Sequence, residues 1–408
     1  MERHSSKWLL CSAILSISLL TTMAGAAIAP ALDVIQAHFC GLNPLWVQML
    51  VSVPALFIIL PTFIFPRLTR RYTTRTLVVG ALLIYIITGS AAYLINSIWL
   101  IMILRAILGC SVGVLMPLST GLLYHYFSQK HHARLMGISS SMNYLGAVVA
   151  TLLTGLLSHI QWNYSFLVYL GGLVALIPCA LFLPADKIGQ EQRREPIQNG
   201  EAGENGSEKP QRKPQKEAKG TFLILLMFLS MSTFFIYPTN YAIQCASDGY
   251  MVPSPLITVL MATMDCIAML IGMVFADIMG WLKGKVRFAA PLAFLAGYGI
   301  LALFPQMEAS IAGSVLVGIG SGLALPLVFA SAGKIYGPAR ATQLMPKLSA
   351  ALNAAQFLVP FIVSALSIPL GTTPHRPYIV ALLFSFLLLL TSSRLNKQGA
   401  RAKETTSL

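Results

Sequence analysis

The stretch RAILGCSVGVLMPL, residues 105–118, has a counterpart 209 residues later in SVLVGIGSGLALPL, residues 314–327. Both contain Gly-x-x-x-Gly-x-x-x-Pro-Leu, which falls on Gly109, Gly113 and Pro117 and then on Gly318, Gly322 and Pro326. Small residues four apart let two helix backbones approach closely, so convergent helix packing explains part of this match. The shared Pro-Leu and the matching place in each half of the chain favour a duplicated unit.

The composition places the chain in a membrane. Of its 408 residues, 56% are hydrophobic and 10% are charged, whereas a soluble domain carries roughly 25% charged residues. The surface must therefore face a medium that does not solvate charge. The net charge of +14 indicates a nucleic-acid partner only where basic residues cluster. Here the basic residues alternate from loop to loop between apolar runs, and we expect no nucleic-acid partner.

Twelve apolar runs are each long enough to cross a bilayer as a helix, which takes about 20 residues. They fall at about 8–29, 45–65, 76–95, 98–126, 135–157, 164–183, 221–245, 255–276, 287–305, 309–335, 344–369 and 376–393. The first run is too long for the apolar region of a signal peptide, so we expect it to be retained.

The twelve runs are divided equally by a polar segment, residues 184–220, which is nearly devoid of large apolar side chains. Such a segment cannot bury enough surface to fold and is expected to be a flexible linker. We therefore predict an all-α membrane protein of two six-helix bundles, residues 1–183 and 221–395. A short tail, residues 396–408, follows the second bundle.

The basic residues predict the orientation in the membrane. If both termini lie in the cytoplasm, 26 of the 28 Lys and Arg residues fall on the cytoplasmic side, and only Arg105 and Arg376 do not. The outer segments carry Asp33, Asp248 and Glu308 instead. This asymmetry follows the positive-inside rule. We expect a multi-pass protein of the cell membrane, and the short loops suit a bacterial inner membrane.

The loop PRLTRRYTTR, residues 66–75, resembles the loop between helices 2 and 3 of the major facilitator superfamily, in particular of its twelve-helix drug:proton antiporter-like branch. That loop reads Gly-x-Leu-Ala-Asp-Arg-x-Gly-Arg-Arg, with an acid that helps latch the two halves. Arg70 replaces the acid here, whereas Asp277 keeps it in the second half. The gating-loop residues that the resemblance implies are Leu68, Arg70, Arg71, Arg75, Asp277, Gly280 and Lys283. The orientation rule alone explains the basic charges but not the spacing of Asp277 and Gly280.

Two helix motifs extend the resemblance to nearly all of the chain outside the linker and tails. Arg105 and Gly109 match the Arg-x-x-x-Gly of helix 4 in the antiporters. Helix 5 of the antiporters carries Gly-x-x-x-Gly-Pro-x-x-Gly-Gly, of which this chain keeps Gly146 and Gly155 but has Thr151 in place of proline. The resemblance implies the major facilitator fold, with alternating access to a central cavity.

Two charged side chains are predicted deep in the membrane, Arg105 in helix 4 and Asp265 in helix 8. A charge at this depth costs roughly 2.5–3.5 kcal/mol even on a lenient scale, and arginine does not lose its proton. Burial disfavours the ionised form of a carboxyl, so Asp265 is suited to load and release a proton. We predict that both residues act in proton coupling. The alternatives are an Arg105 that snorkels outward as an anchor and a protonated Asp265 in a structural hydrogen bond.

The resemblance also implies that helices 1, 4, 7 and 10 line the cavity, with helices 5 and 11 reaching it. The candidate substrate-binding residues are Thr21, Thr22, Ser111, Met116, Asn143, Tyr237, Asn240, Tyr241, Gln244, Ser314, Ser321, Asn353 and Gln356. Each of them also suits plain helix packing. An apolar, aromatic and Met-containing lining adapts to varied partners. It fits a lipophilic or amphipathic substrate better than a sugar, whose hydroxyls need dense polar pairing.

The leading prediction is a secondary active transporter that exports a small lipophilic or amphipathic compound in exchange for protons. The sequence has no Gly-x-x-x-x-Gly-Lys-Ser/Thr loop and no catalytic or metal-ligand constellation, so we expect neither an enzyme nor a cofactor. The expected partners are lipid, a small-molecule substrate and protons, and we expect a monomer. A proton symporter or facilitator for a small metabolite is one alternative, which Arg70 and Thr151 keep open. A non-transporting receptor or scaffold is another.

Overall fold

The computed structural model describes residues 2–127, 129–186, 213–247, 254–304, 306–336, 338–371 and 375–404. Of the predicted linker, residues 187–212 lie outside this part, and α9 already begins at Lys213. Within the described residues, twelve helical spans are long and apolar enough to cross a membrane, which confirms the predicted number.

The first bundle is built from α1 to α7. Its elements are α1 (Glu2–Ala26), η1 (Ala29–Ala31), α2 (Leu32–His38), α3 (Pro44–Arg71), α4 (Thr74–Ala91), η2 (Ala92–Leu94), α5 (Ile98–Tyr126), α6 (Gln129–Ser158), η3 (Trp162–Gly172) and α7 (Leu173–Phe182). The first span is longer than predicted, since it continues through α2 to His38. Pro30 has no N–H to donate and fixes its own φ, so the chain bends through η1 before the helix resumes.

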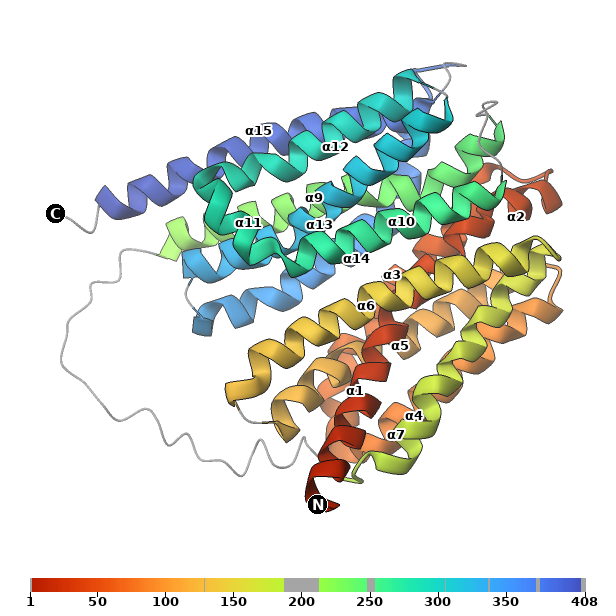
Figure 1. Ribbon diagram of the computed structural model, residues 1–408, viewed down its shortest axis with the longest axis vertical. Helices are drawn as coiled ribbons and strands as arrows, with labels where there is room; N and C mark the ends of the chain where they lie inside the picture. The colour runs from red at the N-terminus through yellow and green to blue at the C-terminus, as the bar shows by residue number, and fades with distance from the viewer. Residues whose placement is uncertain are drawn as a thin grey trace.

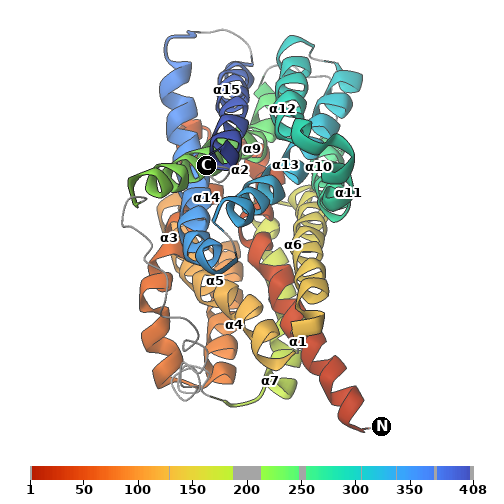
Figure 2. The same ribbon diagram turned by 90° about the vertical axis from the view of Figure 1, so that its left-hand side faces the viewer.

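The second bundle is built from α9 to α15. Its elements are α9 (Lys213–Ser247), α10 (Ser254–Met273), α11 (Phe275–Leu282), η4 (Lys283–Lys285), α12 (Val286–Leu303), α13 (Met307–Tyr336), α14 (Pro338–Ser367) and α15 (Arg376–Glu404). α15 therefore extends through most of the predicted tail. The two bundles lie side by side in both views (Figures 1 and 2), which confirms the predicted fold class.

The two copies of the glycine motif make the same kind of contact in each bundle. The first copy, in α5, packs on α3, and the second, in α13, packs on α10. A Cβ at any of the four glycines would crowd a backbone carbonyl of the facing helix; the pairs are Gly109 with Pro54, Gly113 with Ile58, Gly318 with Met264, and Gly322 with Ala268. The glycines thus let the helix backbones touch. Pro117 and Pro326 lie farther along the same two helices.

Chain direction defines two faces of the molecule. The termini face is the end at which α1 begins and α15 ends, and the opposite face is the end that carries α2 (Figure 1). Because successive spans alternate in direction, α3 and α10 begin at the opposite face, whereas α6, α9 and α14 end there. The depth of a residue between the two faces therefore follows from its position along its helix.

Candidate functional site: a cavity between the bundles

A cavity of about 270 Å³ lies between the two bundles. Helices α1, α3, α5 and α6 line it from the first bundle, and α9, α10, α13 and α14 line it from the second. Most of the wall is apolar. Its polar side chains are Thr21, Thr22, Asn143, Tyr144, Thr151, Asp265, Ser321, Asn353 and Gln356. A ligand in the cavity therefore meets one carboxyl, that of Asp265, among neutral hydroxyl and amide groups.

Seven of the predicted substrate-binding residues line the cavity: Thr21, Thr22, Met116, Asn143, Ser321, Asn353 and Gln356. Asn143 is held by the Thr21 hydroxyl, which donates to its Oδ1 at 2.7 Å. Asn353 donates to the Ser349 carbonyl on its own helix at 2.9 Å. Both amides are thus partly oriented by hydrogen bonds to neighbouring protein groups.

The other predicted candidates lie outside this lining: Ser111, Tyr237, Asn240, Tyr241, Gln244 and Ser314. Tyr237 stacks on Tyr241 with ring centroids 4.5 Å apart, and its hydroxyl lies 2.6 Å from that of Ser314. Both tyrosines are buried inside the second bundle. The Tyr237 hydroxyl thus joins α9 to α13. Ser111 donates to the Leu108 carbonyl one turn earlier.

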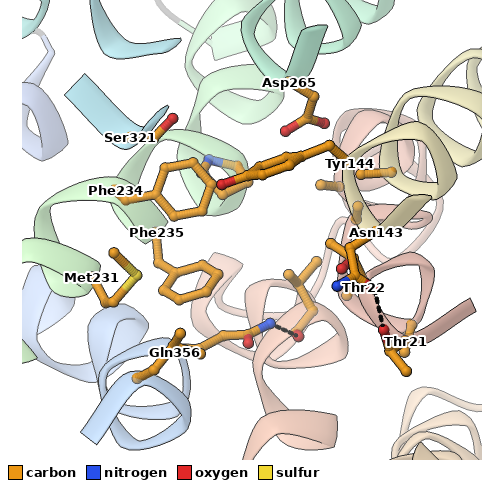
Figure 3. A pocket seen from close by; sticks show the side chains of 18 of the residues that line it. Thr21, Thr22, Asn143, Tyr144, Met231, Phe234, Phe235, Asp265, Ser321 and Gln356 are labelled. Carbon is orange, nitrogen blue, oxygen red and sulfur yellow. Dashed lines mark hydrogen bonds between the residues drawn. The ribbon is translucent and has the colours of Figure 1, made fainter. Parts of the chain in front are cut away.

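Asp265 faces the cavity. It is 9% exposed on α10, and its carboxyl points into the pocket (Figure 3). Within the described residues it makes no hydrogen bond and no ion pair. Tyr144 lies near enough to interact with it electrostatically. Because a buried carboxylate without a partner is costly, this carboxyl is free to take up a proton or a ligand group.

Arg105 lies behind the cavity wall and is 1% exposed. Its Nε donates to the Leu50 carbonyl at 2.8 Å, and Nη1 donates to the Tyr169 hydroxyl. That hydroxyl donates in turn to the Ala24 carbonyl at 3.1 Å. Arg105 thereby joins α5 to α3, α1 and η3. No hydrogen bond connects it to Asp265 in the described part of the chain, so any joint role in proton coupling lacks direct contact.

Several residues of the cavity wall were not singled out from the sequence, and the large ones among them include Tyr144, Met231, Phe234 and Phe235. In Figure 3, Tyr144 and Phe234 reach into the pocket from different bundles, with Asp265 on one side of them and Gln356 on the other. A signal was available, because Tyr144 adjoins Asn143 and the two phenylalanines lie one turn before Tyr237. Aromatic side chains also face lipid, so the sequence alone does not say which ones turn inward.

The bundles pack on each other mainly through α6 with α10 and α3 with α14. In the described part of the chain, two side-chain hydrogen bonds and one close glycine contact between them lie toward the opposite face or at the cavity rim. Gln48 donates to the Asn240 side chain at 2.9 Å. Gln356 donates to the Val51 carbonyl at 3.3 Å. A Cβ at Gly155, near the end of α6, would collide with Thr258 at the start of α10. These two helices are therefore in close contact at this point. By contrast, Gly146 packs within its own bundle, on the Leu19 backbone. The cavity is therefore closed toward the opposite face.

The predicted gating loops lie at the ends of spans. Arg71 is the last residue of α3, with Leu68 one turn earlier, and Arg75 donates to the Ala180 carbonyl in its own bundle. The side chain of Arg70 lies outside the described residues. In the second bundle, Asp277 and Gly280 are exposed on α11, and Lys283 opens η4. Within the described residues, the Asp277 side chain has no ion-pair partner.

Known proteins provide an independent comparison. Residues 14–244 match the family model described as Major Facilitator Superfamily. Two curated relatives, both named multidrug resistance protein B homolog, come from Mycobacterium tuberculosis strains CDC 1551 / Oshkosh and ATCC 25618 / H37Rv. Each is 31% identical over 119 residues, which is 29% of this chain. The match spans only 22% of the relatives' length.

Solved structures resemble the whole chain in fold. A bacterial homolog of the human lysosomal transporter Spinster, inward-facing and unoccupied, has a TM-score of 0.71 at 13% identity, over 96% of this chain and 98% of that chain. A mutant of the peptide transporter POT has a TM-score of 0.72 at 13% identity, over 96% and 95%. At these identities the likeness concerns the fold alone.

Proposed function

This chain belongs to the Major Facilitator Superfamily and is a transporter rather than an enzyme, and from that premise we propose that it exports a small lipophilic or amphipathic compound in exchange for protons. The observation that carries the proposal is Asp265, whose carboxyl faces the cavity between the bundles and has no partner among the described residues. A carrier driven by protons needs a group that is alternately protonated and free, and Asp265 offers that group within the described lining.

The cavity wall supports an amphipathic substrate. Phe234, Phe235 and Met231 give it an apolar side that tolerates differently shaped molecules. The amides of Asn143 and Gln356 provide a few polar contacts. Such a lining has too few polar groups to replace the water shell of a sugar. The names of the curated relatives agree with this substrate class, although they concern those proteins.

The exchange follows from competition at one carboxyl. With the termini face in the cytoplasm, as the basic residues predict, the closure on the opposite face seals the cavity from the outside. Substrate enters from the cytoplasmic side and Asp265 gives up its proton there. After the bundles rock, a proton from the outside neutralises Asp265 and the substrate leaves. Transport is coupled because the cavity binds the substrate less tightly when Asp265 is protonated than when Asp265 is ionised.

The proposal is tested with Asp265→Asn in proteoliposomes that carry a pH gradient and a clamped membrane potential, with ethidium as the amphipathic probe. The wild type is expected to accumulate ethidium against its gradient. Asp265→Asn is expected to lose this accumulation while keeping its fold and its exchange of ethidium down a gradient. Asp265→Glu, which keeps the carboxyl, serves as the control. Full accumulation by Asp265→Asn overturns the role of this residue.

A proton symporter or facilitator for a small metabolite is the second candidate. The polar side chains Thr21, Thr22 and Asn143, gathered on one side of the cavity, favour a substrate with several hydrogen-bonding groups. Membrane vesicles of both orientations distinguish the two candidates, because an exporter and a symporter move the same substrate in opposite directions under one pH gradient.

A further inference from the structure

Gln356 reaches from one bundle into the other. It lies on α14 of the second bundle, and its Nε2 donates to the Val51 carbonyl on α3 of the first. The same nitrogen lies 2.8 Å from the place that a Cβ on Gly25 would occupy. The amide therefore sits in a notch between α1 and α3, at the edge of the cavity (Figure 3).

The missing side chain of Gly25 leaves the space that the Gln356 amide occupies. It lies in the last turn of α1, and its φ is not in the left-handed region. Both atoms within 4 Å of its ideal Cβ position belong to Gln356. Neither backbone conformation nor packing within the first bundle requires a glycine here. The notch at Gly25 is explained by the side chain that enters it from the other bundle.

The amide is held loosely and remains accessible. Its bond to Val51 is long, at 3.3 Å, near the outer limit of a hydrogen bond. Its Oε1 accepts no hydrogen bond from any described residue and is not sealed from the cavity. Another polar contact between the bundles, from Gln48 to Asn240, is shorter and lies between two buried side chains. Gln356 is thus the contact that a ligand in the cavity can reach.

Resting on the proposed function, we propose that the Gln356 amide is the subsite for an N–H or O–H donor of the substrate, and that occupying it releases the contact between the bundles. A donor bound to Oε1 draws the amide out of the notch at Gly25. The bond to Val51 breaks, and the closure on the opposite face then depends on the remaining contacts. Gln356 is in this way a positioning residue that links ligand binding to opening.

The contact of the Gln356 amide with the Val51 carbonyl, called the tether from here on, is tested first without a ligand. The measurement is hydrogen–deuterium exchange of the opposite-face ends of α3 and α9 in the full-length protein. Gln356→Ala removes the amide, and Gly25→Ala displaces it with a methyl group. Each is expected to speed exchange there by roughly two- to tenfold, the range that one neutral hydrogen bond contributes to an equilibrium. Gly80→Ala, in α4, is the matched control, because its Cβ would meet nothing within 4 Å.

A double mutant separates the tether from general damage. With Gln356→Ala in place, nothing else lies near the Gly25 Cβ position, so adding Gly25→Ala is expected to cause no further increase. Full additivity would mean that the two residues act independently and would overturn the proposal. Unchanged exchange in both single variants would overturn it as well.

Two cationic probes then test the subsite. Ethidium carries amino groups that donate hydrogen bonds, whereas tetraphenylphosphonium has no hydrogen-bonding group. Ethidium is expected to speed exchange at the opposite face in the wild type but not further in Gln356→Ala, and tetraphenylphosphonium is expected to have no such effect. Equal effects of both probes, or no effect of ethidium in the wild type, would overturn the release step. Failure of proton drive in the Asp265 experiment would instead refute the proposed function and leave the ligand-free results to decide the tether.

Discussion

The two bundles are built on the same plan but treat buried charge differently. The first buries Arg105 and binds it to the Leu50 carbonyl and the Tyr169 hydroxyl, away from the cavity. The second buries Asp265 beside the cavity and gives it no partner among the described residues. The position 209 residues after Arg105 holds Ser314, whose neutral hydroxyl contacts Tyr237. Two bundles with the same kind of glycine contact therefore differ in their buried charge: Arg105 is bonded within its bundle, whereas Asp265 faces the cavity.

The difference has a physical consequence for each bundle. A guanidinium that donates to groups on two neighbouring elements, one of which is itself bonded to a third, helps fix their relative positions, because moving any one of them leaves buried polar atoms unpaired. A carboxyl without partners fixes nothing, and its charge state is controlled by what enters the cavity. The first bundle is thus expected to respond to mutation in its stability and the second in its proton coupling.

Arg105→Leu is expected to give the largest effect and tests whether the buried charge of the first bundle serves its stability. The change leaves the Leu50 carbonyl without its donor and removes one of the two bonds of the Tyr169 hydroxyl. We expect a loss of about 3–6 kcal/mol, because each of the two lost hydrogen bonds to a charged group contributes about 1.5–3 kcal/mol. Asp265→Asn is expected to change stability by about 1 kcal/mol or less, since no contact is lost. Denaturant titration in detergent measures both. Equal losses in the two variants would contradict the division of roles.

The fold was predictable because membrane spans leave a strong sequence signal. Each run of about 20 apolar residues has few alternatives to a helix in lipid, and the polar residues 184–220 separate the two sets. The extension of the first span to His38 was missed, because a helix that resumes after Pro30 looks in sequence like a helix that has ended there. The start of α9 at Lys213 was missed for a related reason, as its first turns are polar.

The site was predictable only in part, since a sequence does not state which way a side chain turns. Asp265 and Asn143 stand out as polar residues in apolar runs, and both line the cavity. Tyr237 and Tyr241 stand out equally and pack within the second bundle instead. Tyr144 and Phe234 face the cavity but look like ordinary membrane aromatics. Rotation about each helix axis, set by packing between helices, decides these cases.

Gly109→Ala and Gly318→Ala sharpen the comparison at equivalent positions. Each methyl group would press on a backbone carbonyl, of Pro54 in one bundle and of Met264 in the other. We expect each change to cost about 1–3 kcal/mol, as overpacking does, with the two losses similar because the contacts are alike. Gly80→Ala is expected to cause no loss. Thermal unfolding measures all three, and a loss at only one site would mean that the two motif copies are not equivalent.

Tyr169→Phe tests whether Arg105 acts through its hydrogen bonds. The ring and its contact with the guanidinium, 5.2 Å from the ring centroid, remain, while the bonds to Arg105 and to the Ala24 carbonyl are lost. We expect a loss of about 1–3 kcal/mol, smaller than for Arg105→Leu. In the Arg105→Leu background the same change is expected to cost less than in the wild type, because only the bond to the Ala24 carbonyl then remains to be lost. Two independent losses would show that Tyr169 stabilises the bundle separately.

The smallest effect is expected at the contact from Gln48 to Asn240, which belongs to neither buried charge. Gln48→Ala removes one neutral hydrogen bond between the bundles, so the closure on the opposite face is expected to weaken by roughly two- to tenfold. The stability of each bundle is not expected to change, because no contact within a bundle is lost. Hydrogen–deuterium exchange at the opposite-face ends of α3 and α9 measures the closure, and thermal unfolding measures the stability. A large loss of stability with unchanged exchange would place this amide pair in the folding of the bundles, so that closure of the cavity would rest on Gln356 and on the close packing of Gly155 against Thr258.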